Sequence, residues 1–271
     1  MRKFGKGLLR PDLEKLARRG EYELSKAPNG SGSLTPAIRY DQGQTPTCGP
    51  HSAAGVVWTA ANAAGVSLPA LSPRFIAANI YADLRSANTP VDQPLSPLQY
   101  QGIDLSDGAT ALRNWGVAPM AEPTTADGRV SDIELAPPSN IFPEPNVGQL
   151  VIAAGELISG EYQIPVTSVA PVTCALAIDN KAPIWVGFFC DTAFEELTST
   201  SVAQPADLDD PNGGGHAVYL SAYRTAADGT FEFLIQNSWG TDWAINGSVW
   251  ASSAWVAAAW MLWPFPIAVS A

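Results

Sequence analysis

The sequence predicts an α+β protein in which helical segments precede the strands. In the first half, a nearly continuous run of apolar and small residues follows Cys48, and Ser72-Pro73 is a helix cap followed by a first-turn proline. In the second half, short apolar runs are separated by turn residues such as Asp228-Gly229. The 271 residues are enough to bury a sizeable core, as one large domain or as two lobes.

Residues 41–149 are expected to form a helical lobe. Small and polar side chains recur on one face of the run after Cys48, which is typical of a buried central helix. Gly116 is suited to ending a helix because glycine adopts the left-handed conformation without strain. Helices are predicted at residues 48–64, 72–84 and 107–115. The proline-rich residues 119–149 are predicted to be a connector or surface loop.

Residues 150–271 are expected to form a β-rich lobe. Strands are predicted at residues 183–189, 217–222, 231–236 and 248–251, after a short helix at residues 172–178. The apolar run at residues 255–271 is interrupted by two prolines, at positions 264 and 266. This interruption favours a closing buried strand or turn over a membrane span, and we expect no membrane partner.

Charge is distributed unevenly along the chain. The net charge is −11, yet residues 1–26 contain eight Lys or Arg and four Asp or Glu, so this arm carries about +4 and the remainder about −15. An acidic body repels phosphate backbones, which argues against a nucleic-acid partner. The basic arm is either a solvated end or a segment that contacts the acidic body or a separate anionic partner.

Residues 1–40 are expected to be a basic N-terminal arm and linker. A short helix is predicted around residues 11–19, and residues 27–33 have the glycine, serine and proline content of a linker. The apolar stretch of a signal peptide is not recognised after the first basic residues. Three cysteines form no disulfide framework, and Cys174 and Cys190 lie in apolar surroundings typical of buried thiols. We therefore expect a cytoplasmic or other reducing compartment.

Cys48 has the surroundings of a reactive thiol. Turn-forming residues precede it, and Gly49, Pro50 and an alanine-rich apolar run follow, so the thiol is expected at the start of a helix. The helix dipole and the N–H groups of the first turn stabilise a thiolate, the form that attacks carbonyls. Pro50 fits the first turn because its missing N–H has no helical partner there.

Three further motifs accompany Cys48. His216 follows three glycines, Asn237 lies about twenty residues later in Asn-Ser-Trp-Gly, and the pair Gln42-Gly43 stands six residues before Cys48. In this order and spacing the four elements resemble the papain-like cysteine peptidases. The resemblance implies a papain-like two-lobe fold, with a helical lobe, an antiparallel β-rich lobe and the active site in the groove between them.

The resemblance also implies a role for each residue. Cys48 is the expected nucleophile, His216 the acid and base, and Asn237 the residue that orients the imidazole. The Gln42 side chain and the Cys48 backbone N–H are expected to form the oxyanion hole. Trp239 is expected to shield the contact between Asn237 and His216 from water. No cofactor and no metal ion is expected.

Other positions leave alternatives open. His51 lies one helical turn after Cys48, so it is either a packed histidine, a residue that tunes the substrate groove, or a competing base. Gly108 lies in a region that resembles a substrate-facing loop of the family, and its backbone could bond a peptide. Asp207, Asp209 and Asp210 could bind a cation or favour basic substrates, but such an acidic loop is expected to be only solvated, and calcium is not predicted.

The chain also departs from the family pattern. Gly49 stands where the family typically has a tryptophan, and Thr45 where many members have a disulfide-forming cysteine. The forty residues before the catalytic segment are too few for the long inhibitory propeptide of papain-like zymogens, so either activity is restrained otherwise or the chain begins after processing.

The predicted function is thiol-dependent hydrolysis of peptide bonds by a cysteine endopeptidase, with a peptide or protein as substrate. Two alternatives remain open. One is a papain-fold amidase or transferase acting on cell-wall or isopeptide bonds. The other is a catalytically weak papain-fold protein with a binding or structural role, in which Gly49 has eroded the site.

Overall fold

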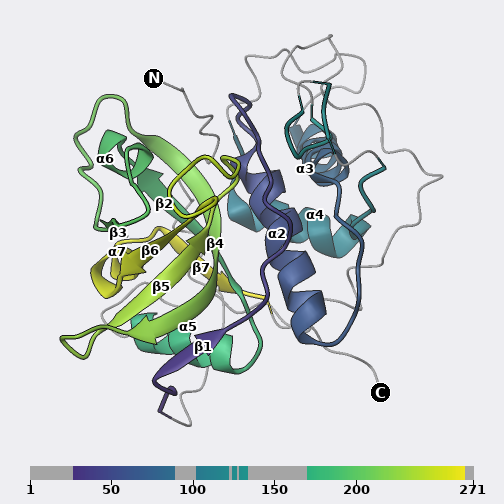
Figure 1. The fold of residues 1–271 in the computed structure, drawn as a ribbon. Coiled ribbons are helices and arrows are strands. Elements are labelled where there is room, and N and C mark those ends of the chain that lie inside the picture. The colour runs from purple at the N-terminus through teal and green to yellow at the C-terminus, as the bar shows by residue number, and fades with distance from the viewer. Residues whose placement is uncertain (1–26, 89–101, 122–123, 127, 134–169, 266–271) are drawn as a thin grey trace.

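The protein is described here from a computed structural model, which covers residues 27–88, 102–121, 124–126, 128–133 and 170–265 (Figure 1). Helices α2, α3 and α4 lie on one side of the molecule, and a seven-stranded sheet with three shorter helices lies on the other. The predicted α+β fold class is confirmed. The boundary expected between residues 149 and 150, the basic arm at residues 1–26 and the helix expected at residues 11–19 lie outside the described residues.

The sheet is organised around its longest strand, β4. Its order is β3-β6-β5-β4-β2-β7, with β1 paired to β4 outside this path, and only β3 and β6 pair in parallel. The strands are β1 (Ser31–Ser33), β2 (Ile184–Cys190), β3 (Val202–Ala203), β4 (Gly214–Thr225), β5 (Phe231–Gln236), β6 (Ser248–Ser252) and β7 (Met261–Pro264). The four predicted strands are present as β2, β4, β5 and β6, and β7 is the expected buried closing strand.

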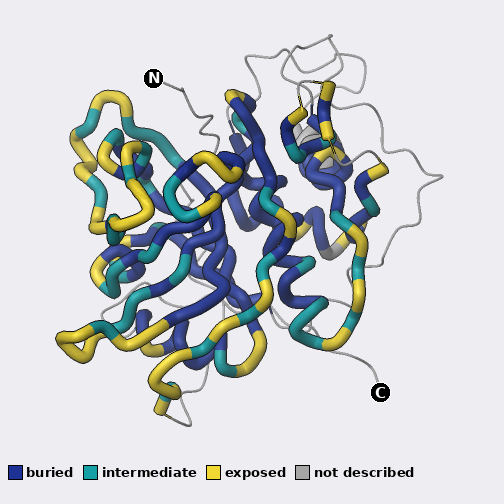
Figure 2. The backbone as a smooth tube through the Cα atoms, viewed as in Figure 1, coloured by how far each residue is buried: buried dark blue, intermediate teal, exposed yellow. Residues whose placement is uncertain are grey.

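The helical lobe consists of α2 (Cys48–Ala63), α3 (Pro73–Asn88) and α4 (Leu105–Trp115). The central helix α2 packs against β4 on one side and against α3 and α4 on the other, and it is buried along most of its length (Figure 2). Side-chain caps explain where α3 and α4 begin. The Ser72 hydroxyl accepts from the Phe75 N–H, and the Asp104 carboxylate accepts from the Ser106 N–H. The Asp104 cap lets α4 begin two residues before the predicted position.

Three shorter helices accompany the sheet: α5 (Ala170–Asp179), α6 (Thr192–Glu195) and α7 (Ser253–Ala257). Helix α5 corresponds to the predicted short helix, whereas α6 and α7 were not predicted. Each of the latter has a capping side chain, Asp191 for α6 and Ser252 for α7. Among the helices of the described ranges, none has the length and apolar character needed to cross a membrane.

The predicted linker at residues 27–33 is partly a strand, so that prediction was wrong. Residues of β1 pair with β4, and Gly32 lies opposite Tyr223. A Cβ atom at Gly32 would stand 2.7 Å from Tyr223 Cε1, so glycine lets the two strands pair here without displacing the tyrosine ring. The glycine and serine content therefore reflects close packing as well as turn formation.

A second close approach joins the two halves of the molecule. A Cβ atom at Gly55 of α2 would lie 2.4 Å from Tyr219 Cε1 of β4, and both residues are buried. Trp185 of β2 is fully buried in the same apolar cluster as α2. The central helix can therefore lie directly on the sheet because its contact residues are small.

Residues 128–133, here called the strap, lie within the predicted connector and hold the starts of two helices. The Val130 carbonyl accepts from the Asp41 N–H at 2.9 Å, just before the chain enters α2. The Asp132 carboxylate accepts from the Ser72 hydroxyl, which caps α3, and from the Arg74 N–H at 3.0 Å. The strap is thus part of the lobe and not a loose connection.

Buried His51 in α2 makes the stability of the fold depend on pH. Burial lowers the pKa of His51 to about 4; its bond to the Thr47 carbonyl opposes this shift, and the positive charge of Arg129 adds to it. The unfolded chain takes up this proton near its ordinary pKa of about 6.5. We therefore expect the free energy of unfolding to fall between about pH 6.5 and pH 4, by up to about 3 kcal/mol from this residue.

Urea unfolding at about pH 7 and about pH 4.5 checks this expectation when the wild type is compared with His51→Phe, which cannot be protonated. The difference between the two proteins separates His51 from other titrating groups, such as Asp132, whose pKa burial raises. The wild type should lose more free energy on acidification than the variant. An equal loss in both proteins would show that His51 does not carry the effect.

Asn79 of α3 carries a buried side-chain amide that makes no hydrogen bond to the described residues. The side chain is 1% exposed, and within the described ranges neither Oδ1 nor Nδ2 has a partner. Because a buried unpaired polar group costs free energy, we expect Asn79→Leu to raise the free energy of unfolding by about 1 kcal/mol or more. Denaturant unfolding measures this change. Asn62→Leu, at a partly exposed amide of α2, is the matched control and should have a smaller effect, and a destabilising Asn79→Leu would contradict the prediction.

Candidate active site

Cys48 is the first residue of α2, as predicted, and its side chain is fully buried. The preceding Thr47 is the N-cap, but its side chain makes no capping bond. Its hydroxyl instead lies 2.5 Å from the hydroxyl of Thr45. The cap therefore takes none of the first-turn N–H groups, and the positive end of the helix acts on the cysteine sulfur.

His216 and Asn237 are joined by a hydrogen bond. His216 lies in β4 opposite Phe188 of β2, and Asn237 directly follows β5, where its N–H bonds the Gly247 carbonyl at 2.9 Å. His216 Nε2 is 2.9 Å from Asn237 Oδ1. Since an amide oxygen only accepts, Nε2 carries the hydrogen and Nδ1 is the basic nitrogen of the neutral ring. The Ser238 N–H also donates to this Oδ1, at 2.8 Å, so the amide has one orientation.

Aromatic rings enclose the imidazole of His216. The Trp239 ring stacks on it with a centroid distance of 4.6 Å and an interplanar angle of 24°. Phe188 meets it edge-on at 5.6 Å. Trp239 is fully buried, and so is His216. The bond between His216 and Asn237 therefore lies in a dry environment, where hydrogen bonds are stronger than in water.

Gln42 is fully buried and its amide is held on both sides. Its Oε1 accepts from the Ser238 hydroxyl at 2.6 Å, and its Nε2 donates to the Thr45 carbonyl at 2.8 Å. The backbone N–H of Gln42 bonds the Ser238 carbonyl at 2.8 Å, beside an antiparallel bridge between Asp41 and Trp239. The Gln42 segment and the Asn-Ser-Trp-Gly segment, which are about 195 residues apart, are thus paired.

Two glycines near the nucleophile have packing roles. A Cβ atom at Gly49 would lie 2.4 Å from Ile103 Cδ1, so Ile103 fills the space beside the first turn of α2. A Cβ atom at Gly108 would lie 2.6 Å from Trp185 Cη2. Gly108 is inside α4, and its N–H bonds the Asp104 carbonyl at 3.1 Å. The N–H of Gly108 is therefore engaged within the helix, and the expected backbone contact of Gly108 with a peptide stays a prediction.

His51 is bonded at both ring nitrogens. Its Nδ1 lies 2.8 Å from the Thr47 carbonyl oxygen, and its Nε2 lies 2.9 Å from Ser131 Oγ. The ring is fully buried and meets Tyr40 edge-on at 5.9 Å. These contacts fit the packed histidine among the three alternatives and leave no ring nitrogen for proton transfer.

The acidic residues before His216 organise loops. Asp210 Oδ2 accepts from the Thr192 N–H at 2.6 Å, and Asp191 accepts from the Asp207 N–H at 2.8 Å. In the part of the chain that the structure describes, no group of three or more His, Cys, Asp or Glu residues could hold a metal ion. Cys174 and Cys190 are fully buried, as expected, and none of the three cysteines forms a disulfide.

Sequence reasoning missed Ser238, Ser131 and Arg129. Ser238 lies inside the recognised Asn-Ser-Trp-Gly motif, so the sequence could have identified it as a candidate site residue. Ser131 and Arg129 carried no signal, because they lie in the proline-rich connector and reach residues about 80 to 88 positions earlier in the chain.

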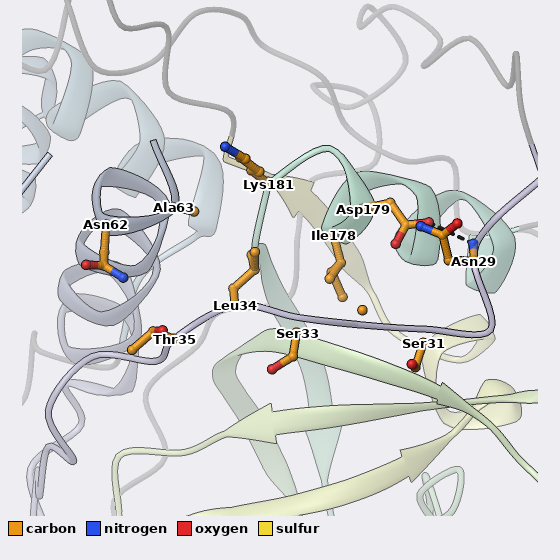
Figure 3. A pocket seen from close by; sticks show the side chains of 11 residues that line it. Asn29, Ser31, Ser33, Leu34, Thr35, Asn62, Ala63, Ile178, Asp179 and Lys181 are labelled. Carbon is orange, nitrogen blue, oxygen red and sulfur yellow. Dashed lines mark hydrogen bonds between the residues drawn. The ribbon is translucent and has the colours of Figure 1, made fainter. Parts of the chain in front are cut away.

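One surface pocket, of about 460 Å³, lies away from these residues (Figure 3). It is lined by β1 and the residues after it, by Asn62 at the end of α2, and by Asp179 and Lys181 at the end of α5. Since α2 rises about 1.5 Å per residue, Asn62 is roughly 20 Å along the helix from Cys48. This pocket is therefore separate from the candidate active site.

Comparison with known proteins identifies the fold. No protein-family model and no curated protein matches the chain. Among solved structures, xylellain, a cysteine protease from Xylella fastidiosa, matches with a TM-score of 0.71 and 21% identity over 99% of this chain and 98% of that chain. Digestive procathepsin L 3 of Tenebrio molitor larval midgut matches with a TM-score of 0.60 and 20% identity, over 96% of this chain and 75% of that chain.

The bromelain protease of Ananas comosus, in complex with the inhibitor E64, matches with a TM-score of 0.55 and 18% identity, over 88% of this chain and 99% of that chain. At such identities the likeness concerns the fold. The helices before the sheet, the central buried helix and these structural neighbours agree with the expectation from the sequence. The chain therefore has the papain-like cysteine protease fold.

Proposed function

We propose that the protein is a cysteine endopeptidase that hydrolyses peptide bonds with Cys48 as nucleophile. The observation that carries the proposal is the 2.9 Å bond between His216 Nε2 and Asn237 Oδ1. This bond holds the imidazole in the tautomer whose Nδ1 can exchange a proton with a thiol. The other support is the position of Cys48 at the uncapped start of a sixteen-residue buried helix, which favours the thiolate.

The proposed reaction has two steps, acylation of Cys48 and hydrolysis of the acyl-enzyme. The Cys48 thiolate attacks the peptide carbonyl, and the oxyanion receives hydrogen bonds from the Cys48 N–H and from the Gln42 amide. The imidazolium of His216 protonates the leaving amine, so the C–N bond breaks and an acyl-enzyme remains. Neutral His216 then takes a proton from water, which attacks the thioester and releases the carboxylic acid, and Cys48 returns to its starting state.

The surroundings of Gln42 suit the role of oxyanion donor. Its Oε1 is fixed by the Ser238 hydroxyl, and one hydrogen of its Nε2 meets the Thr45 carbonyl. We assign the Gln42 side-chain amide as a donor to the oxyanion, because an amide nitrogen bears two hydrogens and can donate in two directions. A donor fixed before the reaction needs little reorganisation when charge develops on the substrate.

The burial of both reacting side chains has a consequence for substrate entry. Cys48 and His216 are each 0% exposed. A peptide can reach the sulfur only when the surface over it moves. Once bound, it reacts in a largely desolvated site, where electrostatic interactions are strong.

Hydrolysis of an unstructured protein or a fluorogenic peptide under reducing conditions tests the proposal. We expect turnover, covalent labelling of Cys48 by a peptidyl epoxide, and loss of both in Cys48→Ala with the fold retained by circular dichroism. Cys174→Ala, at another buried cysteine, is the matched control and should keep its activity. A folded, reduced wild type that hydrolyses no peptide and leaves Cys48 unlabelled would contradict the proposal.

Asn237→Ala tests the orienting bond. Without Oδ1 the His216 ring loses its fixed tautomer, so we expect kcat/KM to fall by up to about 10²-fold. The control is Asn212→Ala, an exposed asparagine in the loop before β4. Steady-state kinetics on the same peptide compares them. Equal kcat/KM values in the wild type and Asn237→Ala would remove Asn237 from the mechanism.

A further inference from the structure

The strap reaches the peptide group that precedes the nucleophile. The Ile133 N–H donates to Ser131 Oγ at 3.0 Å, and Ser131 Oγ is bonded to His51 Nε2 at 2.9 Å. His51 Nδ1 is bonded to the Thr47 carbonyl at 2.8 Å. These contacts form an unbroken chain from the strap to the residue before Cys48.

The chemistry of the Thr47 carbonyl sets the direction of this chain. A carbonyl oxygen only accepts, so His51 Nδ1 carries the hydrogen and Nε2 accepts from the Ser131 hydroxyl. Every group in the chain therefore donates towards Thr47. Hydrogen bonds arranged in one direction polarise one another, and this effect is larger where water is excluded. Ser131 and His51 are both 0% exposed.

The Thr47 carbonyl and the Cys48 N–H belong to the same peptide group. Its oxygen accepts twice, from His51 Nδ1 and from the His51 backbone N–H at 3.1 Å. Donors on the oxygen draw electron density from the nitrogen, which makes the N–H a stronger donor. The same two bonds fix the plane of the peptide, and hence the direction in which the Cys48 N–H points.

The strap holds the other oxyanion segment in a similar way. Arg129 is 7% exposed, and its Nη1 donates to the Asp41 carbonyl at 2.9 Å, in the peptide group that precedes Gln42. Its Nη2 donates to the Ile133 carbonyl at 3.1 Å, which closes the strap on itself. The peptide groups before Gln42 and before Cys48 are thus both bonded to one short segment.

We propose that His51 is a positioning residue of the oxyanion hole, which acts through the Thr47 carbonyl and is held in place by Ser131 of the strap. The inference rests on the proposed peptidase function. It predicts that His51 affects the steps in which an oxyanion forms and leaves the nucleophilicity of the thiolate unchanged. A residue that only fills the core would change neither the oxyanion-forming steps nor the nucleophilicity of the thiolate, or would change both by disturbing the fold.

Two reactions of Cys48 separate these possibilities. Acylation by a peptide amide passes through an oxyanion, whereas alkylation by iodoacetamide displaces iodide and forms none. A peptide aldehyde adds to the thiol to give a hemithioacetal, whose oxygen occupies the same place as the oxyanion. We therefore compare kcat/KM for a peptide, the inhibition constant of a peptide aldehyde, and the rate constant of alkylation.

His51→Phe keeps a ring of similar size, and with it the contact to Tyr40, but has no donor. We expect its kcat/KM to fall roughly 10- to 50-fold, which is less than the loss of an oxyanion donor itself. The aldehyde should bind more weakly by a similar factor, with an unchanged alkylation rate. The pH profile of kcat/KM should keep its apparent pKa values, because Cys48 and His216 set these values, and only its maximum should fall.

Conservative and control variants complete the test. His51→Asn places an amide N–H near the position of Nδ1, so it should recover part of the loss. Ser131→Ala removes the donor to Nε2 and should give a smaller loss of the same pattern, and it carries the test if His51→Phe does not fold. Thr59→Val removes a different buried hydroxyl of α2, which bonds Tyr219, and should behave as the wild type.

Three outcomes would overturn the inference. The first is an unchanged kcat/KM in folded His51→Phe. The second is an alkylation rate that falls by the same factor as kcat/KM, because His51 would then act on the thiol or on the fold. The third is a His51→Asn variant no more active than His51→Phe. A wild type that reacts with iodoacetamide but hydrolyses no peptide would contradict the proposed function, and this inference with it.

Discussion

The burial of α2 is the constraint on which the rest of the structure depends. Thirteen of its sixteen residues are buried, so neighbouring elements must come close to its backbone. Gly49 and Gly55 allow this approach, since a side chain at either would collide with its neighbour. Polar groups on such a helix also need partners. Ser52 shows the result: its hydroxyl donates to the Cys48 carbonyl and accepts from the Trp185 indole of β2, which ties the first turn of the helix to the sheet.

The second constraint is the pairing of two segments from opposite ends of the described chain. The Gly240 N–H bonds the Tyr40 carbonyl, and Asp41 pairs with Trp239. Gly240 has a φ of +73°, and a Cβ atom there would lie 2.8 Å from Asp41 Oδ2. The last glycine of Asn-Ser-Trp-Gly is therefore needed for the segments to meet. The candidate oxyanion donor and the candidate orienting residue are consequently parts of one backbone arrangement, although they lie far apart in the sequence.

The sequence predicted the parts of this molecule whose signals are local. The starts of α2 and α3, the turn before β5 and the motifs around Cys48, His216 and Asn237 each lie within a few neighbouring residues. It could not predict the bond from Ser131 to His51, which spans 80 positions, or the closeness of Gly108 to Trp185. It also misread residues 31–33, because glycine and serine are as suitable for a crowded strand pair as for a linker. In each case the missing information was a contact between distant segments.

The two histidines of the chain illustrate how surroundings decide function. Both are fully buried, yet His216 is bonded to an amide oxygen through Nε2, whereas His51 has a carbonyl at one nitrogen and a hydroxyl at the other. Burial lowers the pKa of His51 to about 4, because a cation in its place would lie without solvent, and the positive charge of Arg129 adds to this shift. A ring that must stay neutral cannot serve as the acid for a leaving amine. It can, however, fix the orientation of a peptide group, and a donor N–H with a fixed direction stabilises a developing oxyanion.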